Sequence, residues 1–198
     1  MRPVGHVTRP RGARLQPPKA YMKHVMLDLE TLGTTADSVI LSIGAVKFDL
    51  ESDAIDDAGF YASVSIESCQ SYGRTIDEAT LVWWLQQSAE AREVFTEPKQ
   101  SLDSALASLT DWLGHNKRYV WSNGASFDIP MLEHAYKKLG WDAPWEFWNS
   151  RCVRTYKSLP CADRVTKPAN DHNALRDAIN QARYVQAIHA RLKKMVPA

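Results

Sequence analysis

The stretch His24-Val-Met-Leu-Asp-Leu-Glu30 is an apolar run that carries two carboxylates near its end. Its composition, followed by a turn-rich segment from residue 33 to 38, predicts a buried strand. Because side chains alternate along a strand, Asp28 and Glu30 leave the same face. Two neighbouring anions on an apolar strand repel one another unless a cation or solvent compensates. The pair therefore predicts either a cation site or an exposed strand end.

Further elements are predicted along the rest of the chain. Strands are expected at residues 39–48, 60–66 and 119–122, and the short links between the first three strands favour an antiparallel meander. Helical patterns follow at Leu81, Trp84 and Leu85, over 102–113, from about 127 to 139 before Gly140, and over 174–195. In the last of these helices we expect five apolar side chains to face inward: Ile179, Ala182, Val185, Ile188 and Leu192. The sequence thus predicts an α/β domain around a mixed sheet.

Composition narrows the protein class. The chain has 198 residues, of which 44% are hydrophobic and 24% charged, as in a single globular domain with a sizeable core. No uncharged apolar run approaches the roughly 20 residues of a membrane-spanning helix, and no signal-type segment opens the chain. The three cysteines have no metal-site or disulfide spacing. We expect a cytoplasmic protein that does not bind a membrane.

Charge divides the chain into three parts. Residues 1–21 carry five basic and no acidic side chains and include four prolines, which predicts a disordered basic tail ahead of a single domain over residues 22–198. Residues 22–150 carry 9 basic and 20 acidic groups, whereas residues 151–198 carry 10 and 3. Such an acidic body beside a basic third fits either a cation site next to a polyanion site or two solvated faces.

Two later segments add polar groups that suit the first pair. Trp121-Ser-Asn-Gly-Ala-Ser-Phe-Asp128 places a carboxylate in the first turn of a predicted helix, where the helix dipole alone would explain it. In Asp171-His-Asn-Ala-Leu-Arg-Asp177, the histidine and the last aspartate can converge only if His172 precedes the helix. Asp171 or Asn173 as the N-cap residue would allow that arrangement.

Together these residues predict a metal-dependent hydrolase. Four carboxylates, of Asp28, Glu30, Asp128 and Asp177, form a hard oxygen donor set suited to Mg²⁺ or Mn²⁺. Two such ions can stabilise the attacking and the leaving oxygen of a phosphoryl transfer. His172 supplies a base, because a histidine with an ordinary pKa near 6.5 accepts a proton at neutral pH.

The three segments resemble the motifs of the DEDDh 3'-5' exonucleases of the ribonuclease H-like superfamily. The matching residues are Asp28-Leu-Glu30, then Asn123 with Phe127-Asp128, then His172 with Asp177. The resemblance covers about residues 22–195. The stretches Leu27–Gly33 and Ile40–Val46, with Trp83-Trp84 and Gln87, are most similar to a branch with a phage exonuclease A and a mycobacterial exoribonuclease.

The resemblance implies a ribonuclease H-like five-stranded sheet whose second strand is antiparallel to the others, flanked by helices. It implies two-metal hydrolysis of single-stranded RNA or DNA from the 3' end to nucleoside 5'-monophosphates, with Asp28, Glu30, Asp128 and Asp177 as metal ligands and His172 as general base. By analogy, Leu29, Thr31 and Phe127 would hold the terminal nucleotide, and Asn123 matches the asparagine of the motif. Some relatives dimerise, so we also expect a homodimer.

Two other function classes stay open at this point. A small-nucleotide phosphohydrolase would use the same residues in a closed pocket, and an inactive nucleic-acid-binding module would keep the fold without the chemistry. Of the paired tryptophans, Trp84 is expected in the core and Trp83 is the better candidate for stacking on a base. We expect Trp141, Trp145 and Trp148 to serve packing or a subunit interface.

Overall fold

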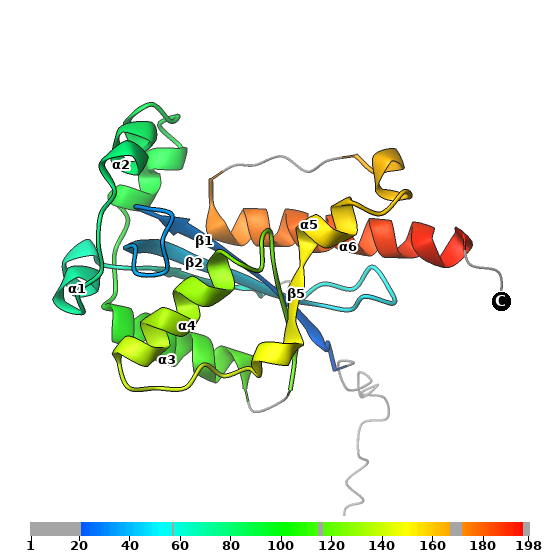
Figure 1. Ribbon diagram of the computed structural model, residues 1–198, viewed down its shortest axis with the longest axis horizontal. Coiled ribbons are helices and arrows are strands. Elements are labelled where there is room, and N and C mark those ends of the chain that lie inside the picture. Colours follow the sequence, from blue (N-terminus) through cyan, green and yellow to red (C-terminus); the bar gives the residue numbers. More distant parts are fainter. Residues whose placement is uncertain (1–20, 57, 115–116, 167–171, 196–198) are drawn as a thin grey trace, which may run out of the picture.

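The computed structural model describes residues 21–56, 58–114, 117–166 and 172–195, and its centre is a mixed five-stranded sheet in the order β3-β2-β1-β4-β5 (Figure 1). The strands are β1 (His24–Thr31), β2 (Ile40–Phe48), β3 (Phe60–Ser63), β4 (Tyr119–Ser122) and β5 (Ser150–Cys152). Strand β2 pairs antiparallel with β1 and β3, whereas β4 pairs parallel with β1 and β5. The predicted meander and the predicted antiparallel second strand are confirmed.

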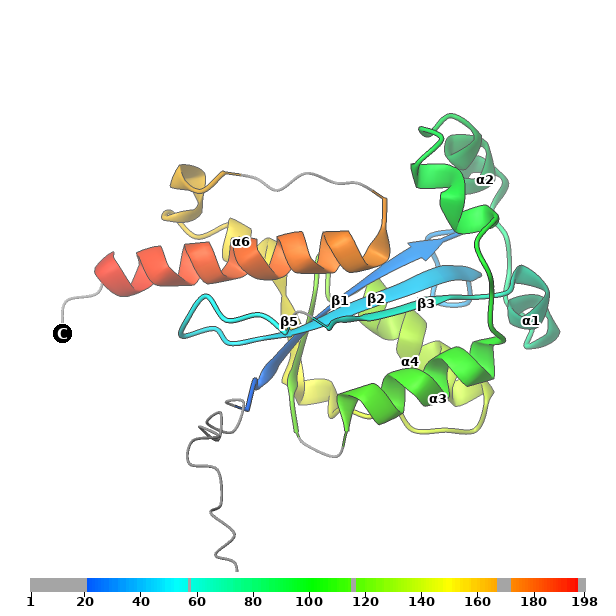
Figure 2. The same ribbon diagram turned by 180° about the vertical axis from the view of Figure 1, so that it is seen from behind.

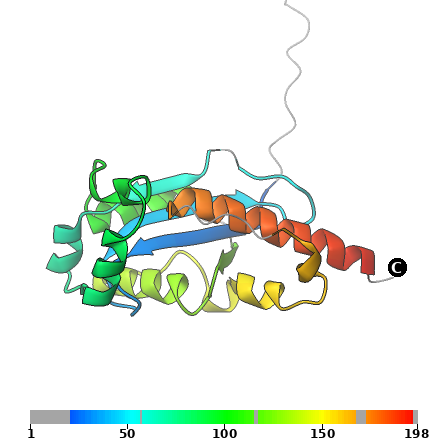
Figure 3. The ribbon, with the colours of Figure 1, turned by 90° about the horizontal axis from the view of Figure 1, so that it is seen from above.

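Helices cover both faces of the sheet. The α-helices are α1 (Ile66–Ser71), α2 (Glu78–Leu85), α3 (Leu102–Leu113), α4 (Asp128–Lys138), α5 (Val153–Lys157) and α6 (Ala174–Met195). Three short 3-10 helices are η1 (Ala91–Phe95), η2 (Phe147–Asn149) and η3 (Ala162–Arg164). Helix α6 lies along one face, and α3 and α4 lie on the other (Figures 2 and 3).

The side chains of β1 point alternately to the two faces of the sheet, where they join two separate hydrophobic cores. Val25, Leu27 and Leu29 are buried with residues of α3 and α4. Met26 is buried on the opposite face, among residues of α5 and α6. Since Asp28 and Glu30 continue the Met26 series, both carboxylates belong to the face that α6 covers.

Most of the predicted elements lie where the sequence places them. The bounds of α3, β4 and α6 agree with the prediction, and α4 begins one residue later than expected and precedes Gly140, whose φ is +73°. Of the five apolar residues expected to face inward from α6, Ala182, Val185 and Ile188 are buried, and Ile179 and Leu192 are partly buried against the same core.

One predicted strand bound was wrong, and one predicted helical stripe is mostly exposed. The third strand ends at Ser63 instead of residue 66, because the Ser65 side chain accepts a hydrogen bond from Ser68 N and caps α1. Leu81 and Leu85 are 38% and 65% exposed. Helix α2 is short and stands at the end of the sheet, so only Trp84 of the predicted stripe reaches the core.

Gly44 of β2 allows α6 to approach the sheet closely. It lies directly opposite Asp28 in the β1–β2 register. A Cβ atom at Gly44 would lie 2.1 Å from the carbonyl carbon of Ala174 and 2.3 Å from the nitrogen of Leu175. No real Cβ contact is that short, and the neighbouring atoms are backbone. Glycine at this position therefore brings the first turn of α6 next to the acidic end of β1.

We expect Gly44→Ala to destabilise the protein by about 1–3 kcal/mol, the usual cost of overpacking. For a chain of this size, that cost corresponds to a fall in Tm of about 2–12 °C, measured by calorimetry. An unchanged Tm would contradict the close approach of α6 to β2.

Tyr21, the first described residue, packs against the start of the segment that leads into β4. The Tyr21 hydroxyl donates to the carbonyl of Lys117, and the Arg118 guanidinium lies 4.7 Å from the centre of the Tyr21 ring. The tail prediction otherwise falls on residues 1–20, outside the described residues. Within the part that is described, no helix combines the length and apolar character needed to cross a membrane.

Candidate active site

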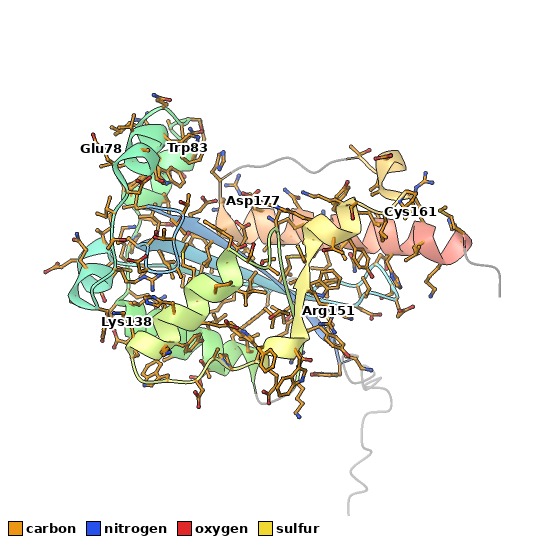
Figure 4. All side chains as sticks on the ribbon, in the orientation of Figure 1. Glu78, Trp83, Lys138, Arg151, Cys161 and Asp177 are labelled. Carbon is orange, nitrogen blue, oxygen red and sulfur yellow. The ribbon has the colours of Figure 1, made fainter. Side chains whose placement is uncertain are left out.

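Carboxylates from β1 and α6 meet above one end of the sheet. Asp28 and Glu30 lie on β1, on the face that α6 covers. Asp177 lies in the first turn of α6, where Figure 4 labels it. Ligand oxygens of these three side chains lie within 4.8 Å of one another. Glu30 and Asp177 are buried, and Asp28 is partly buried. The structure thus brings together three of the four predicted metal ligands as one oxygen cluster.

The fourth carboxylate reaches the same cavity from the other side of the sheet. Asp128 is the first residue of α4 and is buried. The backbone N–H of Leu29 donates to its Oδ1 over 3.2 Å, so β1 itself orients this side chain. A cavity of about 200 Å³ is lined by Asp28, Leu29, Glu30, Asn123, Phe127, Asp128, Arg154, His172 and Gln181.

Burial and mutual repulsion raise the pKa values of these acids. Burial raises the pKa of Glu30 to about 8, and the charges of Asp177 and Asp128 contribute. Burial likewise raises the pKa of Asp128 to about 7. The pKa of Asp28 is well above its usual range, first because of burial and then because of Asp128 and Glu30. Without a counterion, the cluster therefore holds protons at neutral pH.

This donor set fits divalent cations with a preference for oxygen. All four acids offer carboxylate oxygens, which Mg²⁺ and Mn²⁺ prefer, and no thiol or imidazole is part of the three-residue cluster. The raised pKa values reflect mainly burial of the charged carboxylates and, for Asp28 and Glu30, also repulsion from neighbouring acids, both of which a bound cation would offset. Asp28, Glu30, Asp128 and Asp177 are the residues that would hold such ions.

The raised pKa of Glu30 predicts that the stability of the metal-free protein depends on pH and that bound metal counteracts this dependence. Its pKa is about 8 in the folded protein and about 4.5 in an unfolded chain, so the folded state binds the proton more tightly. Stability of the metal-free protein therefore falls as the pH rises from about 4.5 to about 8. We expect Tm to fall by several degrees between pH 5 and pH 8, and Mg²⁺ or Mn²⁺ to raise Tm more at pH 8 than at pH 5.

Glu30→Gln should reduce the pH dependence of Tm, because it removes one of the titrating groups, while Asp28 and Asp128, whose pKa values are also raised, remain. Glu67→Gln, a change at an exposed position of α1, serves as the matched control and should keep the wild-type profile. Identical profiles for wild type and Glu30→Gln would show that Glu30 does not titrate in this range.

The histidine precedes α6, as the motif spacing requires. His172 lines the acidic cavity, and its backbone has a φ of 52°, in the left-handed region. Asn173 caps the helix, because its side-chain oxygen accepts a hydrogen bond from Arg176 N over 3.1 Å. This capping turn keeps His172 outside the helix, on the cavity side. Asp171, the other cap candidate, lies outside the described residues.

The predicted substrate contacts are divided between two adjoining cavities. Leu29 and Phe127 line the acidic cavity and also a neighbouring one of about 480 Å³, which Thr31, Trp83 and Trp84 line as well. The Thr31 hydroxyl donates to the carbonyl of Gly33. Asn123 lines only the acidic cavity, where its side-chain oxygen accepts a hydrogen bond from Lys157 Nζ over 3.1 Å.

Two further residues of the site were missed in the sequence. Gln181 donates to Asp28 Oδ1 over 2.8 Å, and it could have been found because it follows Asp177 by one helical turn. Arg154 of α5 lines the cavity, and its charge lowers the pKa of Asp128 against the effect of burial. Nothing in the local sequence distinguishes Arg154 from the other basic residues of the C-terminal third.

Sequence comparisons place the chain among exonucleases. The profile of the Rv2179c-like 3'-5' exoribonuclease domain family matches residues 23–189. An exodeoxyribonuclease of Enterobacteria phage T4 is 24% identical in an alignment 155 residues long, and the match covers 66% of this chain and 68% of the phage protein.

Solved structures share the fold at low sequence identity. E. coli Exonuclease I in complex with a dA16 oligonucleotide has a TM-score of 0.63 at 14% identity over 87% of this chain, which spans only 42% of Exonuclease I. The nuclease domain of 3'hExo, a DEDDh family member bound to rAMP, has a TM-score of 0.57 at 13% identity, covering 89% of this chain and 95% of that domain. The family profile matches this chain over most of its length, residues 23–189, and the chain therefore belongs to the Rv2179c-like 3'-5' exoribonuclease domain family.

Proposed function

We propose that this protein is a divalent-metal-dependent 3'-5' exonuclease that hydrolyses single-stranded RNA or DNA to nucleoside 5'-monophosphates. The observation that carries the proposal is the convergence of Asp28, Glu30, Asp128 and His172 on one cavity of about 200 Å³. Asp177 joins Asp28 and Glu30 in one cluster of carboxylate oxygens beside it. The adjoining cavity of about 480 Å³, which Leu29, Thr31 and Phe127 line, suits a terminal nucleotide beside the reacting phosphate.

The carboxylates, Gln181 and His172 have separate roles in this reaction. The four carboxylates would hold two Mg²⁺ or Mn²⁺ ions, and Gln181 fixes the Asp28 carboxylate by its hydrogen bond. Bound divalent cations supply Lewis-acid activation of water and neutralise charge that develops on phosphate oxygens. His172 takes a proton from the attacking water while the water oxygen forms the new bond to phosphorus. The bond from phosphorus to the 3' oxygen breaks, and that oxygen ends as a hydroxyl with a solvent proton.

Basic residues beside the cavity support a polymeric substrate. Arg154 and Lys157 both extend from α5, and Lys157 reaches Asn123 at the cavity wall. Gly124 leaves room for the arginine, because a Cβ atom at Gly124 would lie 3.3 Å from Arg154 Cζ. Cationic side chains next to a metal site bind the phosphates of the nucleotides that precede the scissile bond. This arrangement favours a nucleic-acid strand over a single nucleotide.

The direct test is a time course on single-stranded RNA and DNA oligonucleotides of identical sequence, labelled at the 5' end. We expect a ladder that shortens from the 3' end with Mg²⁺ or Mn²⁺ and stops in EDTA. The faster substrate identifies the preferred sugar. A thymidine monophosphate p-nitrophenyl ester, assayed in parallel, tests for hydrolysis of small nucleotides.

The other outcomes are equally specific. Cleavage of the small ester without shortening of either polymer would assign a small-nucleotide phosphohydrolase. Binding of labelled oligonucleotide without cleavage of any substrate would assign a binding module. Internal fragments in place of a ladder would contradict an exonuclease.

We also propose a cytoplasmic location and a homodimer. The three cysteines, all within the described part of the chain, are free thiols, as in a reducing compartment. Trp148 is 58% exposed and Trp141 42% exposed, so both are available to a second copy of the chain. Sedimentation equilibrium of the wild type and of Trp148→Ala tests the dimer, which we expect the substitution to weaken.

A further inference from the structure

The side chain of Trp83 packs directly against the predicted general base. The rings of Trp83 and His172 form a T-shaped pair, with centroids 5.0 Å apart and planes at 83°. Trp84 stands behind them, with its centroid 6.1 Å from that of His172. Trp83 is 41% exposed, so its ring is not part of the hydrophobic core. The contact joins α2 to the turn before α6, two segments far apart in the chain.

Trp83 is held in place through Trp84 and through the contacts of α2 with the end of β1. The buried Trp84 indole N–H donates to the carbonyl of Thr31 over 2.8 Å, at the end of the strand that carries Asp28 and Glu30. Trp83 and Trp84 form a second T-shaped pair, with centroids 5.1 Å apart. Asp77, the residue that caps α2, donates its backbone N–H to the carbonyl of Leu32. Helix α2 is therefore anchored to β1, and Trp83 extends that anchor to His172.

The backbone conformation of His172 requires support from neighbouring contacts. A φ of 52° is in the left-handed region, which costs free energy for a residue with a Cβ atom. Such a conformation persists where surrounding contacts determine it. The Asn173 cap fixes the chain after His172, and the Trp83 ring contacts its side chain.

We infer that Trp83 is a positioning residue, which holds the His172 imidazole at the acidic cavity and acts on the reaction through that histidine. The inference rests on the proposed exonuclease function. It differs from a role of Trp83 as a stacking surface for a base, which would contribute to substrate affinity and would not depend on His172.

A double-mutant cycle separates these roles. We expect Trp83→Ala to lower kcat at least 10-fold, with KM for an oligonucleotide changed less than 3-fold. Trp83→Phe, which keeps an aromatic ring, should restore most of kcat. In a His172→Asn background, Trp83→Ala should lower kcat less than 2-fold further, because the group through which it acts is already absent. Leu85→Ala, at a 65% exposed position of the same helix that lines neither cavity, is the control and should leave kcat unchanged.

Three results would overturn the inference. A rise in KM with unchanged kcat would assign Trp83 to base stacking. An equal loss of kcat in both backgrounds would show that Trp83 acts independently of His172. The ring-proton NMR signals of His172 provide a readout without turnover, and they should shift in Trp83→Ala; unchanged signals would disprove the contact. A wild type without nuclease activity would instead overturn the proposed function, while the NMR shift would still report the contact.

Discussion

Asp28→Asn should reduce nuclease activity at least a thousandfold. The substitution keeps the size of the side chain and an oxygen that can still accept the hydrogen bond from Gln181. It removes one charged ligand from the cluster formed with Glu30 and Asp177. A metal site contributes several kcal/mol of stabilisation to the transition state, and each 1.4 kcal/mol corresponds to a factor of ten. Rates of oligonucleotide shortening at saturating Mn²⁺ measure the loss.

The same variant should be at least as stable as the wild type without metal. The pKa of Asp28 is raised by burial and by the charges of Asp128 and Glu30, so the wild-type carboxyl opposes folding when it ionises. Calorimetry in EDTA at pH 8 should therefore show a higher Tm for Asp28→Asn and a smaller rise on adding Mn²⁺. Asp142→Asn, at an exposed position, should match the wild type in both measurements. Wild-type activity and metal affinity in Asp28→Asn would refute the assigned site.

His172→Asn should lower kcat by about 10²- to 10⁴-fold, the usual contribution of a general base. Asparagine suits this position better than alanine, because it tolerates the left-handed backbone conformation that His172 adopts. The substitution leaves all four carboxylates in place. Metal affinity, measured by calorimetric titration, should therefore change far less than kcat.

His189→Asn is the matched control for this histidine. His189 lies on the same helix as Asp177 and contacts Glu51 on the surface, away from the acidic cavity. Its substitution should leave kcat within a factor of two of the wild type. A His172→Asn variant with unchanged kcat would mean that another group accepts the proton of the attacking water.

The sequence predicted the elements whose pattern is long or unambiguous. The apolar run of β1 and the amphipathic pattern of α6 gave nearly correct bounds, since both carry many core residues. Period-two alternation placed Asp28 and Glu30 on one face. The position of His172 before the helix followed from its spacing to Asp177 and from the capping preference of asparagine.

Other features depend on contacts that no local pattern records. Strand β5 has three residues, Ser150–Cys152, and pairs with β4 without an apolar run of its own. Leu81 and Leu85 have a helical spacing, yet α2 lies at the end of the sheet, where only one of its side chains is covered. The ring contact between Trp83 and His172 joins positions that only the folded chain brings together.

The order of the site residues along the chain bears on when a newly made molecule becomes able to cleave nucleic acid. Strand β1 supplies its two acids early in synthesis, whereas His172 and Asp177 are translated after every strand of the sheet. Asp177, the last of the four carboxylates along the chain, comes next to β1 only when α6 packs over Gly44. A ribosome-bound chain that has not yet released this helix therefore has an incomplete acidic cluster.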